Sequence, residues 1–227
     1  MTTDIFHIKL GICSCYLIGG SKGIVMVDAG TPGKIRSFKR KLARLHIHPE
    51  DIKLIVITHS HFDHAGSAKE IRDLTGARIL IHKFEKEYLE DGGFIMPKGV
   101  TLNGKITRPL IFPFLKRIQF PRLKADLLVD NDGLSLHEFG LDGNIIHTPG
   151  HTPGSLSVLL NSGEAFVGCM AHNNFPFRLN PGLPIYAKDI DKVIESWKML
   201  IDKGARTIFP GHGNPFPVEV MKRELSY

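Results

Sequence analysis

Four potential metal ligands fall within six residues of this chain: His59, His61, Asp63 and His64. Imidazole nitrogens and carboxylate oxygens are good zinc ligands. The apolar run 53–58 comes directly before them and is typical of a strand buried on both faces. An extended backbone would point His59, His61 and Asp63 to one face, and a tight turn after Phe62 would bring His64 back towards the same space. The pattern predicts a metal site at the end of a buried strand.

Two later histidines follow predicted strands in the same way. His151 lies in the glycine- and proline-rich segment 148–155, after a strand predicted at 143–146. His212 lies between two glycines, after a strand predicted at 207–209. A glycine beside a histidine lets the backbone turn sharply and pass close to an ion. Each segment alone is a weak signal, but together with the first motif they make a coherent ligand set.

These residues resemble the metallo-β-lactamase superfamily. Its HxHxDH signature is present from His59 to His64, its third-ligand segment matches GHTPGS at His151, and its late histidine matches His212. Val27-Asp28-Ala29-Gly30 also looks like the short motif that follows an early strand in that superfamily. Motif order and spacing agree from about residue 14 to about residue 214. The combination is specific for the fold and the metal site and says little about the substrate.

The resemblance assigns a role to each motif residue. It implies a first metal held by His59, His61 and His151, and a second metal held by Asp63, His64 and His212. It also implies that Asp28 holds a ligand in place, since metal-bound imidazoles need orienting partners. Zinc is the expected metal, as one or two ions, with iron and manganese as alternatives.

Position 169 departs from the usual pattern of the superfamily. Most of its hydrolases have an Asp in a Gly-Asp pair that bridges the two metals, whereas this chain has Gly168-Cys169. A cysteine here resembles some true β-lactamases, in which it binds the second metal, and thiolate is a good zinc ligand. The alternative is a buried cysteine that binds nothing.

Other histidines carry weaker expectations. His172 lies three residues after Cys169 and is a candidate to contact a substrate carbonyl; the alternative is a surface histidine. The remaining histidines lie outside the motifs and are expected to be solvent or packing residues: His7, His46, His48, His82, His137 and His147.

The chemistry implied by the resemblance is hydrolysis by a zinc-held hydroxide, because zinc lowers the pKa of bound water to about 7. Asp63 would help to orient that hydroxide. The leading hypothesis for the bond cut is an acyl bond of an ester, thioester, lactone or β-lactam. A phosphodiesterase or ribonuclease is the alternative enzyme class, and a non-catalytic zinc-binding module is the alternative outside catalysis. No Gly-x-Ser-x-Gly elbow or phosphate-binding loop competes with the metal site.

Composition bounds the class of protein. At 227 residues and 25.3 kDa the chain fits one large domain, and 42% hydrophobic residues are enough for a sizeable core. No run approaches the ~18 apolar residues of a membrane-spanning helix, and the start lacks a secretory signal. Three cysteines do not indicate a secreted disulfide scaffold. We expect a cytoplasmic protein with a small-molecule substrate and no membrane partner.

Charge leaves a nucleic-acid partner open without favouring it. Lys and Arg number 29 against 23 Asp and Glu, which gives a net charge of +6 and a pI of about 9.2. Part of the excess lies in 34–45, where Ile35, Phe38 and Leu42 fall at helical spacing. This spacing favours the solvated face of an amphipathic helix over a nucleic-acid patch.

The elements expected to position the site alternate between strands and helices. Strands are predicted at 5–10, 15–18, 24–27, 53–58, 78–81, 127–129, 134–136, 143–146, 156–160, 165–168 and, last, 207–209. Helices are predicted at about 32–46, 65–74 and 188–203. Both halves are dominated by strands and carry helices, which suggests two packed sheets with helices outside. The resemblance implies the same α+β arrangement, a four-layer αβ/βα sandwich in a single domain.

Residues 92–125 have a different composition. Glycines and prolines interrupt apolar residues too often for a core element. Because long loops in compact domains tend to be functional, the segment is predicted to be an inserted loop or lid over the site. A mobile insertion with no role is the alternative.

Overall fold

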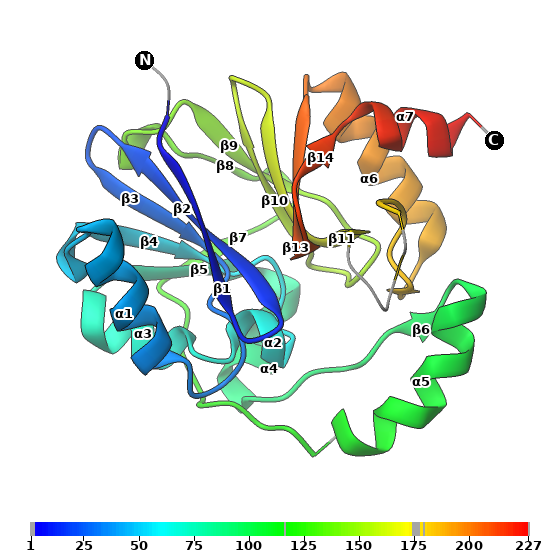
Figure 1. Cartoon of the computed structure of the whole chain (residues 1–227), viewed down its shortest axis with the longest axis horizontal. Helices are drawn as coiled ribbons and strands as arrows, with labels where there is room; N and C mark the ends of the chain where they lie inside the picture. The colour runs from blue at the N-terminus through cyan, green and yellow to red at the C-terminus, as the bar shows by residue number, and fades with distance from the viewer. Residues whose placement is uncertain (1–2, 116, 174–177, 179, 227) are drawn as a thin grey trace.

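Two six-stranded mixed sheets pack face to face in the computed structural model, which describes all residues except 1–2, 116, 174–177, 179 and 227 (Figure 1). The first sheet has the order β1 (Ile5–Leu10), β2 (Cys13–Gly20), β3 (Gly23–Val27), β4 (Ile52–Val56), β5 (Arg78–His82), β7 (Leu127–Val129). The second has the order β14 (Phe216–Pro217), β13 (Thr207–Gly213), β11 (Glu164–Asn173), β10 (Leu156–Leu160), β9 (Gly143–His147), β8 (Leu134–Ser135). Parallel pairing joins β3, β4, β5 and β7 in the first sheet and β11 with β13 in the second.

The core between the sheets consists of side chains from both inner faces. Val25, Val27 and Val56 of the first sheet belong to the same buried cluster as Val158 and Phe166 of the second. These residues lie on strands that are buried almost throughout, as the continuous apolar runs of the sequence predict. The Tyr16 hydroxyl adds a polar tie, since it donates a hydrogen bond of 2.7 Å to the Pro210 carbonyl on the opposite sheet.

Helices cover the outer face of each sheet. α1 (Ile35–Leu45) and α3 (Ala68–Thr75) lie on the first sheet, and α6 (Ile190–Asp202) and α7 (Glu219–Leu225) lie on the second (Figure 1). α1 buries Phe38 and Leu42 against the sheet, and α6 buries Trp197. The predicted four-layer αβ/βα sandwich is therefore confirmed. Of the described residues, no helix is long and apolar enough to cross a membrane.

Several predicted elements differ in extent, and each difference lies near the histidines. The strand predicted at 165–168 continues to Asn173, so Cys169 and His172 lie within β11. The strand predicted at 207–209 continues to Gly213 and is not the last element, because β14 and α7 follow it. The extended backbone predicted through Asp63 is wrong: α2 (Phe62–Ala65) begins after His61, so Asp63 and His64 lie on one helical turn.

The segment 92–125, predicted to be an inserted loop or lid because regular structure is broken too often for a core element, contains a helix. α5 (Leu102–Leu115) is a 14-residue helix, and it follows α4 (Lys86–Asp91) and β6 (Lys98–Gly99). Pro109 and Pro113 lie inside α5 and deprive the carbonyls of Lys105 and Pro109 of their helical partners. Both carbonyls belong to solvent-exposed residues, so water can replace the missing donors. The two prolines therefore do not break the helix.

α5 stands apart from the sandwich, at the lower right of Figure 1. β6 pairs with the short strand β12 (Tyr186–Ala187), which follows the second sheet's longest strand in the chain. Thr107 on α5 shares a hydrogen bond of 2.6 Å with the Tyr186 hydroxyl. α5 is thus attached to the second half of the chain although it belongs to the first.

Candidate metal centre

The predicted ligands meet at one edge of the sandwich, because strands of both sheets end there. His59 and His61 lie between β4 and α2, and His151 lies in the loop between β9 and β10. Cys169 lies on β11 and His212 on β13. All of these side chains are buried. The structure brings together every residue that the sequence assigns to the site.

The first group consists of His59, His61 and His151. Nε2 of His59 lies 3.1 Å from Nδ1 of His61, and Nδ1 of His61 lies 3.2 Å from Nε2 of His151. Three imidazole nitrogens therefore face one small space.

The second group consists of Asp63, His64 and His212. Oδ2 of Asp63 lies 3.1 Å from Nε2 of His212 and 3.8 Å from Nε2 of His64. The two Nε2 atoms lie 3.4 Å apart. This group provides one carboxylate oxygen and two imidazole nitrogens.

Cys169 lies between the two groups. Its Sγ is 3.1 Å from Nε2 of His64. Its ligand atom also lies within 4.8 Å of those of His59 on one side and of His172 and His212 on the other. His172 is buried rather than on the surface, and it packs edge-to-face on the His212 ring.

Each ring is held through its other nitrogen, so the nitrogen that faces the group is fixed. His61, His151 and His212 donate to backbone carbonyls of Ile95, Tyr186 and Ile12, at 3.0, 2.8 and 3.1 Å respectively. His64 donates through Nδ1 to Asp28, and Nδ1 of His59 bonds to the Thr58 hydroxyl. In a neutral ring, the nitrogen that bonds to an acceptor carries the proton. The other nitrogen, which faces the group, therefore has a free lone pair.

This donor set fits a metal ion. In the first group, neutral imidazole lone pairs that face one another at 3.1 and 3.2 Å repel unless a proton or a cation lies between them. Nitrogen, carboxylate and thiolate are the usual donors to zinc. The residues present therefore match the cofactor that the sequence predicts.

Asp28 orients two parts of the site at once. One carboxylate oxygen accepts hydrogen bonds from the Thr58 backbone and hydroxyl at 2.8 and 2.9 Å, and the other accepts from His64 at 2.7 Å. Because the Thr58 hydroxyl donates to Asp28, it can accept from Nδ1 of His59. Asp28 has a φ of 61°, a left-handed conformation that Asp tolerates better than most residues. The contacts fit the orienting role expected of Asp28, and they add Thr58.

The electrostatics of the second group separate it from the first. Burial would raise the pKa of Asp63, but His64 and His212 lower it below its usual range. Burial would lower the pKa of His212, but Cys169 and Asp63 raise it to about 10. Burial would likewise raise the pKa of the Cys169 thiol, but the facing histidines lower it well below its usual value. Without metal, these residues form a network of charged partners.

The histidines of the first group differ from those of the second in their protonation. Burial, followed by the neighbouring imidazoles, lowers the pKa of His59 well below its usual value. Burial and His151 lower the pKa of His61 to about 4. These two imidazoles are neutral at pH 7 and can bind an ion without first releasing a proton. The second group must release protons from its histidines before it binds.

Glu85 is a site residue that no sequence pattern singles out. It is 1% exposed, and one carboxylate oxygen accepts from the backbone and the hydroxyl of Ser60 at 3.0 and 2.6 Å. The other oxygen accepts from the Gly154 backbone at 3.2 Å. Ser60 lies between two ligands of the first group, and Gly154 lies in the loop that carries the third. Glu85 thus joins the two loops that form the first group.

Glycines let the ligand loops approach one another. A Cβ on Gly211 would lie 2.6 Å from Cε1 of His64, and a Cβ on Gly168, whose φ is 51°, would lie 2.5 Å from the Thr58 hydroxyl. Neither position has room for a side chain, which agrees with the expectation for glycines beside ligands.

The other cysteines and histidines lie outside the groups of imidazoles. Cys13 and Cys15 are free and buried, and Cys13 lies behind His64 with Sγ 3.6 Å from Nδ1. His7, His46, His48 and His137 are exposed. His82 stacks on His147 with ring centroids 4.2 Å apart, a packing contact.

A cavity of about 470 Å³ opens on both groups of ligands. The groups contribute His61, Asp63, His151, Cys169 and His212 to its lining, together with His172. Its other walls are mostly apolar. Ile12, Phe62 and Tyr186 contribute to them, and the rest comes from 92–125: Phe94, Met96, Pro97, Asn103, Thr107, Ile111 and Leu115. The segment predicted to be a lid therefore lines the cavity above the ligands, and its function as a lid stays a prediction.

A second, smaller cavity of about 280 Å³ lies beside the first and shares His61, Met96, Pro97 and His151 with it. Its lining differs in charge, because three basic residues, Lys98, Arg108 and Lys188, contribute to it with one acidic residue, Glu85. The site thus has an apolar side and a basic side.

Comparison with known proteins agrees with this geometry. A sequence profile described as the Metallo-beta-lactamase superfamily matches residues 8–212. A probable metallo-hydrolase from Methanocaldococcus jannaschii is 28% identical over 202 residues, or 87% of this chain and 86% of that protein. A metallo-beta-lactamase fold-containing protein from Sulfurisphaera tokodaii is 28% identical over 221 residues, or 94% and 77% of the two chains. The crystal structure of a B3 metallo-beta-lactamase superposes with a TM-score of 0.72 at 23% identity, covering 99% of this chain and 97% of that one. Since the profile spans nearly the whole chain and the buried histidines, aspartate and cysteine form groups able to hold metal ions, this chain belongs to the metallo-β-lactamase superfamily of metallo-hydrolases.

Proposed function

We propose that this protein is a zinc-dependent hydrolase that cleaves an acyl bond of an ester, thioester, lactone or β-lactam. The observation that carries the proposal is the orientation of the imidazoles. Five rings are anchored through one nitrogen and present the other to two adjacent groups at the floor of one cavity. A structural zinc site is normally closed by four protein ligands, whereas the first group has three.

The first group would hold one zinc ion through His59, His61 and His151, and the second group would hold another through Asp63, His64 and His212. Cys169 is proposed as a further ligand of the second group, in place of a bridging aspartate. When bound, zinc supplies a Lewis acid for the attacked carbonyl and lowers the pKa of a water ligand to about 7.

The protein's own residues position the reactants. Asp63 lines the cavity, and its lowered pKa keeps it ionised at neutral pH, so it can accept a hydrogen bond from the attacking water and orient it. His172 lines the same cavity and is proposed to contact the substrate carbonyl. Phe94, Ile111 and Leu115 restrict bulk water at the reacting atoms.

The two cavities favour a small-molecule substrate with an apolar part and an anionic part. The apolar walls of the larger cavity suit an acyl chain or an apolar ring. Lys98, Arg108 and Lys188 on the smaller side suit a carboxylate or a phosphate of the same molecule. The same three cations also favour the second candidate function, a phosphodiesterase or ribonuclease.

Metal analysis combined with a substrate panel tests the proposal. Zinc-loaded protein is assayed on a chromogenic β-lactam, a lactone, thioesters of rising chain length and a bis-aryl phosphodiester. We expect turnover of acyl substrates, and loss of both first-group metal and activity in His61→Ala. The matched control is His137→Ala, an exposed histidine outside the site.

Three results would contradict the proposal. A fully active His61→Ala would remove the metal-dependent mechanism. Turnover of the phosphodiester alone would favour the second candidate. A metal-loaded protein that cleaved nothing in the panel and bound a protein partner tightly would favour a non-catalytic module.

A further inference from the structure

We infer that the outer side of helix α5 is a docking surface for an anionic lipid bilayer. We call this surface the α5 face and define it by four exposed apolar residues of the helix: Leu102, Ile106, Leu110 and Phe114. Among the described residues, only four other large hydrophobic side chains are comparably exposed: Ile12, Phe84, Ile95 and Leu128. Exposed apolar residues that gather in one place mark an interaction site, whereas scattered ones need no explanation.

The spacing of these residues shows that α5 presents two neighbouring rows of side chains, offset from one another by one residue. Leu102, Ile106, Leu110 and Phe114 repeat every four residues along the helix and are 57–76% exposed. Thr107, Ile111 and Leu115 form the second row and line the large cavity. On α5 the second row is covered by the site and the first is left without a cover among the described residues.

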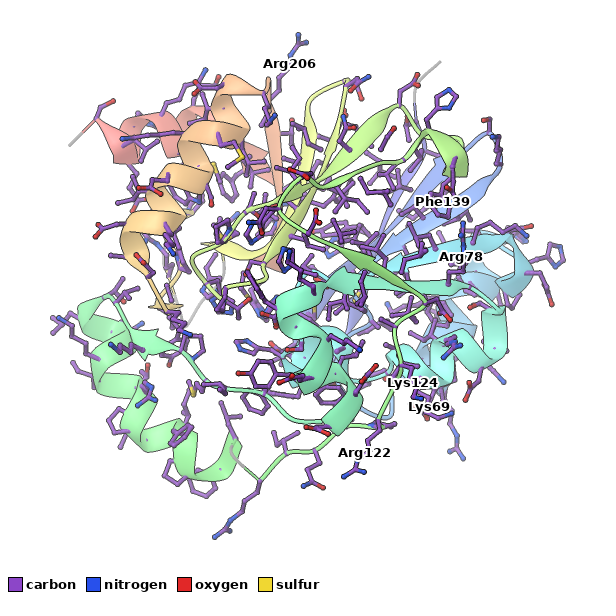
Figure 2. All side chains as sticks on the ribbon, turned by 180° about the vertical axis from the view of Figure 1, so that it is seen from behind. Lys69, Arg78, Arg122, Lys124, Phe139 and Arg206 are labelled. Carbon is purple, nitrogen blue, oxygen red and sulfur yellow. The ribbon has the colours of Figure 1, made fainter. Side chains whose placement is uncertain are left out.

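The charge of the segment around α5 indicates which kind of partner covers the α5 face. Between Asp91 and Asp126 the sequence holds seven basic residues and no acidic one: Lys98, Lys105, Arg108, Lys116, Arg117, Arg122 and Lys124. Figure 2 shows Arg122 at the lower edge of the molecule, whereas Lys124 lies beside Lys69 of α3, away from α5. Lys98, Lys105 and Arg117 are exposed as well. Apolar residues flanked by cations suit the headgroup region of an anionic membrane, where the side chains insert and the cations meet the phosphates.

Helix α1 provides an internal comparison. It and the residue before it carry six basic residues and no acidic one: Lys34, Arg36, Lys39, Arg40, Lys41 and Arg44. The larger apolar residues of α1, however, are directed into the protein, and Phe38 and Leu42 are buried. α1 is therefore a solvated basic face, whereas α5 carries fewer basic residues, Lys105 and Arg108, but combines them with exposed apolar side chains.

Other occupants fit the α5 face less well. A second copy of this chain would bring two segments of seven positive charges together, and like charges across an interface are costly. Nucleic acid would use the cations, but its interfaces are more polar than protein interfaces and have no use for a row of Leu, Ile and Phe. A peripheral position on a lipid surface needs no membrane-spanning helix.

The test measures partition of the metal-loaded protein onto vesicles of phosphatidylcholine with an equal amount of phosphatidylglycerol, and onto phosphatidylcholine alone. We expect binding to the anionic vesicles that weakens with salt. Lys105→Gln/Arg117→Gln should reduce the partition coefficient by about 30-fold, since each cation near the surface contributes ~1 kcal/mol. The matched control is Lys39→Gln/Arg40→Gln on α1, which removes the same charge and should bind like the parent.

The apolar contribution is tested separately. Ile106→Ser/Leu110→Ser should weaken binding at least ~30-fold while thermal unfolding stays unchanged, because both side chains are exposed. Phe114→Trp gives a local reporter, since the only native tryptophan, Trp197, is fully buried. Brominated lipids should quench the new tryptophan and should not quench that of a matched Leu128→Trp variant.

Four outcomes would overturn the inference. The parent protein could sediment equally with neutral and anionic vesicles, or the α1 control could lose as much binding as the α5 variant. Sedimentation velocity could show an oligomer that Ile106→Ser/Leu110→Ser dissociates, which would assign the α5 face to a second copy. Binding of duplex DNA that the charge variant loses and the apolar variant keeps would assign the surface to nucleic acid.

Discussion

Replacing Glu85 tests whether a residue without contact to the ion decides how well the first group is built. Two loops converge on its carboxylate, since one oxygen accepts twice from Ser60 and the other accepts from the Gly154 backbone. In Glu85→Gln the amide oxygen can replace only one carboxylate oxygen. The amide NH2 takes the place of the other oxygen and cannot accept a hydrogen bond. If the amide oxygen keeps both bonds from Ser60, the buried Gly154 N–H is left without an acceptor.

The expected loss follows from that single unmet donor. A buried donor without a partner costs ~1–3 kcal/mol, so the free energy of unfolding of the metal-free protein should fall by that amount. Glu85→Ala removes the acceptors of three donors and should cost ~3–6 kcal/mol. Affinity for the first zinc should fall roughly ten- to hundredfold in Glu85→Gln, as is typical when residues that hold ligands are changed.

The assay is urea unfolding in the presence of a chelator, together with zinc titration against a chromophoric competitor. Glu87→Gln is the matched control, because Glu87 lies two residues away on α4 and is exposed, and its effect should stay within about 0.5 kcal/mol. A Glu85→Gln variant as stable as this control, with unchanged zinc affinity, would refute the reasoning. Reduced stability with unchanged affinity would show that Glu85 supports the fold and not the ligands.

Three further predictions concern the ligands and the cavity. Cys169→Ser should weaken the second zinc more than the first in a calorimetric titration; identical affinities at both sites would show that Cys169 is not a ligand. For metal-free protein, the raised pKa of His212, about 10, stabilises the fold fully below pH 6.5, and this contribution is lost as pH rises towards 10. His212→Asn should therefore flatten that decline in unfolding free energy; an unchanged slope would contradict the assignment. Ile111→Ser on the cavity wall should lower kcat/KM for long-chain thioesters ~10-fold and for acetyl thioesters little, because only the long chain buries against it; an equal loss on both would argue against an acyl-binding cavity.

Local patterns were sufficient to predict the ligands. Each ligand follows or ends a strand, and strand endings are marked by the change from apolar residues to glycine and histidine, as at His151 and His212. Once two sheets pack together, such endings meet at one edge. The superfamily resemblance then predicted which of them share an ion; the two predicted sets are among five overlapping groups that the described residues form, and the assignment to ions stays a prediction.

The acceptors that orient the rings could not be predicted. Ile12, Ile95 and Tyr186 act through backbone carbonyls, which every residue has, so their side chains carry no signal of the role. Glu85 bonds to residues 25 and 69 positions away, and that pairing exists only after the loops meet. These features depend on tertiary packing rather than on local sequence.

α5 was missed for a different reason. Proline inside a helix is unfavourable when the carbonyl it deprives is buried, and the sequence does not reveal that Lys105 and Pro109 face solvent. The apolar residues between the prolines resembled an irregular loop because they lie in two neighbouring rows of the helix. A single apolar stripe, as on α1, is much easier to recognise.

Each of the two ligand groups combines residues from both halves of the chain, and this affects when a metal ion can bind during folding. The first group takes His59 and His61 from the first half of the chain and His151 from the second, and the other group takes Asp63 and His64 from the first half and His212 from the second. Neither half contains either of these two groups complete. A nascent or cleaved chain that contains only one half can therefore complete neither of these two groups, and metal binding at them has to wait until both sheets are docked. Two separately expressed halves would complete these two groups only by reassembling.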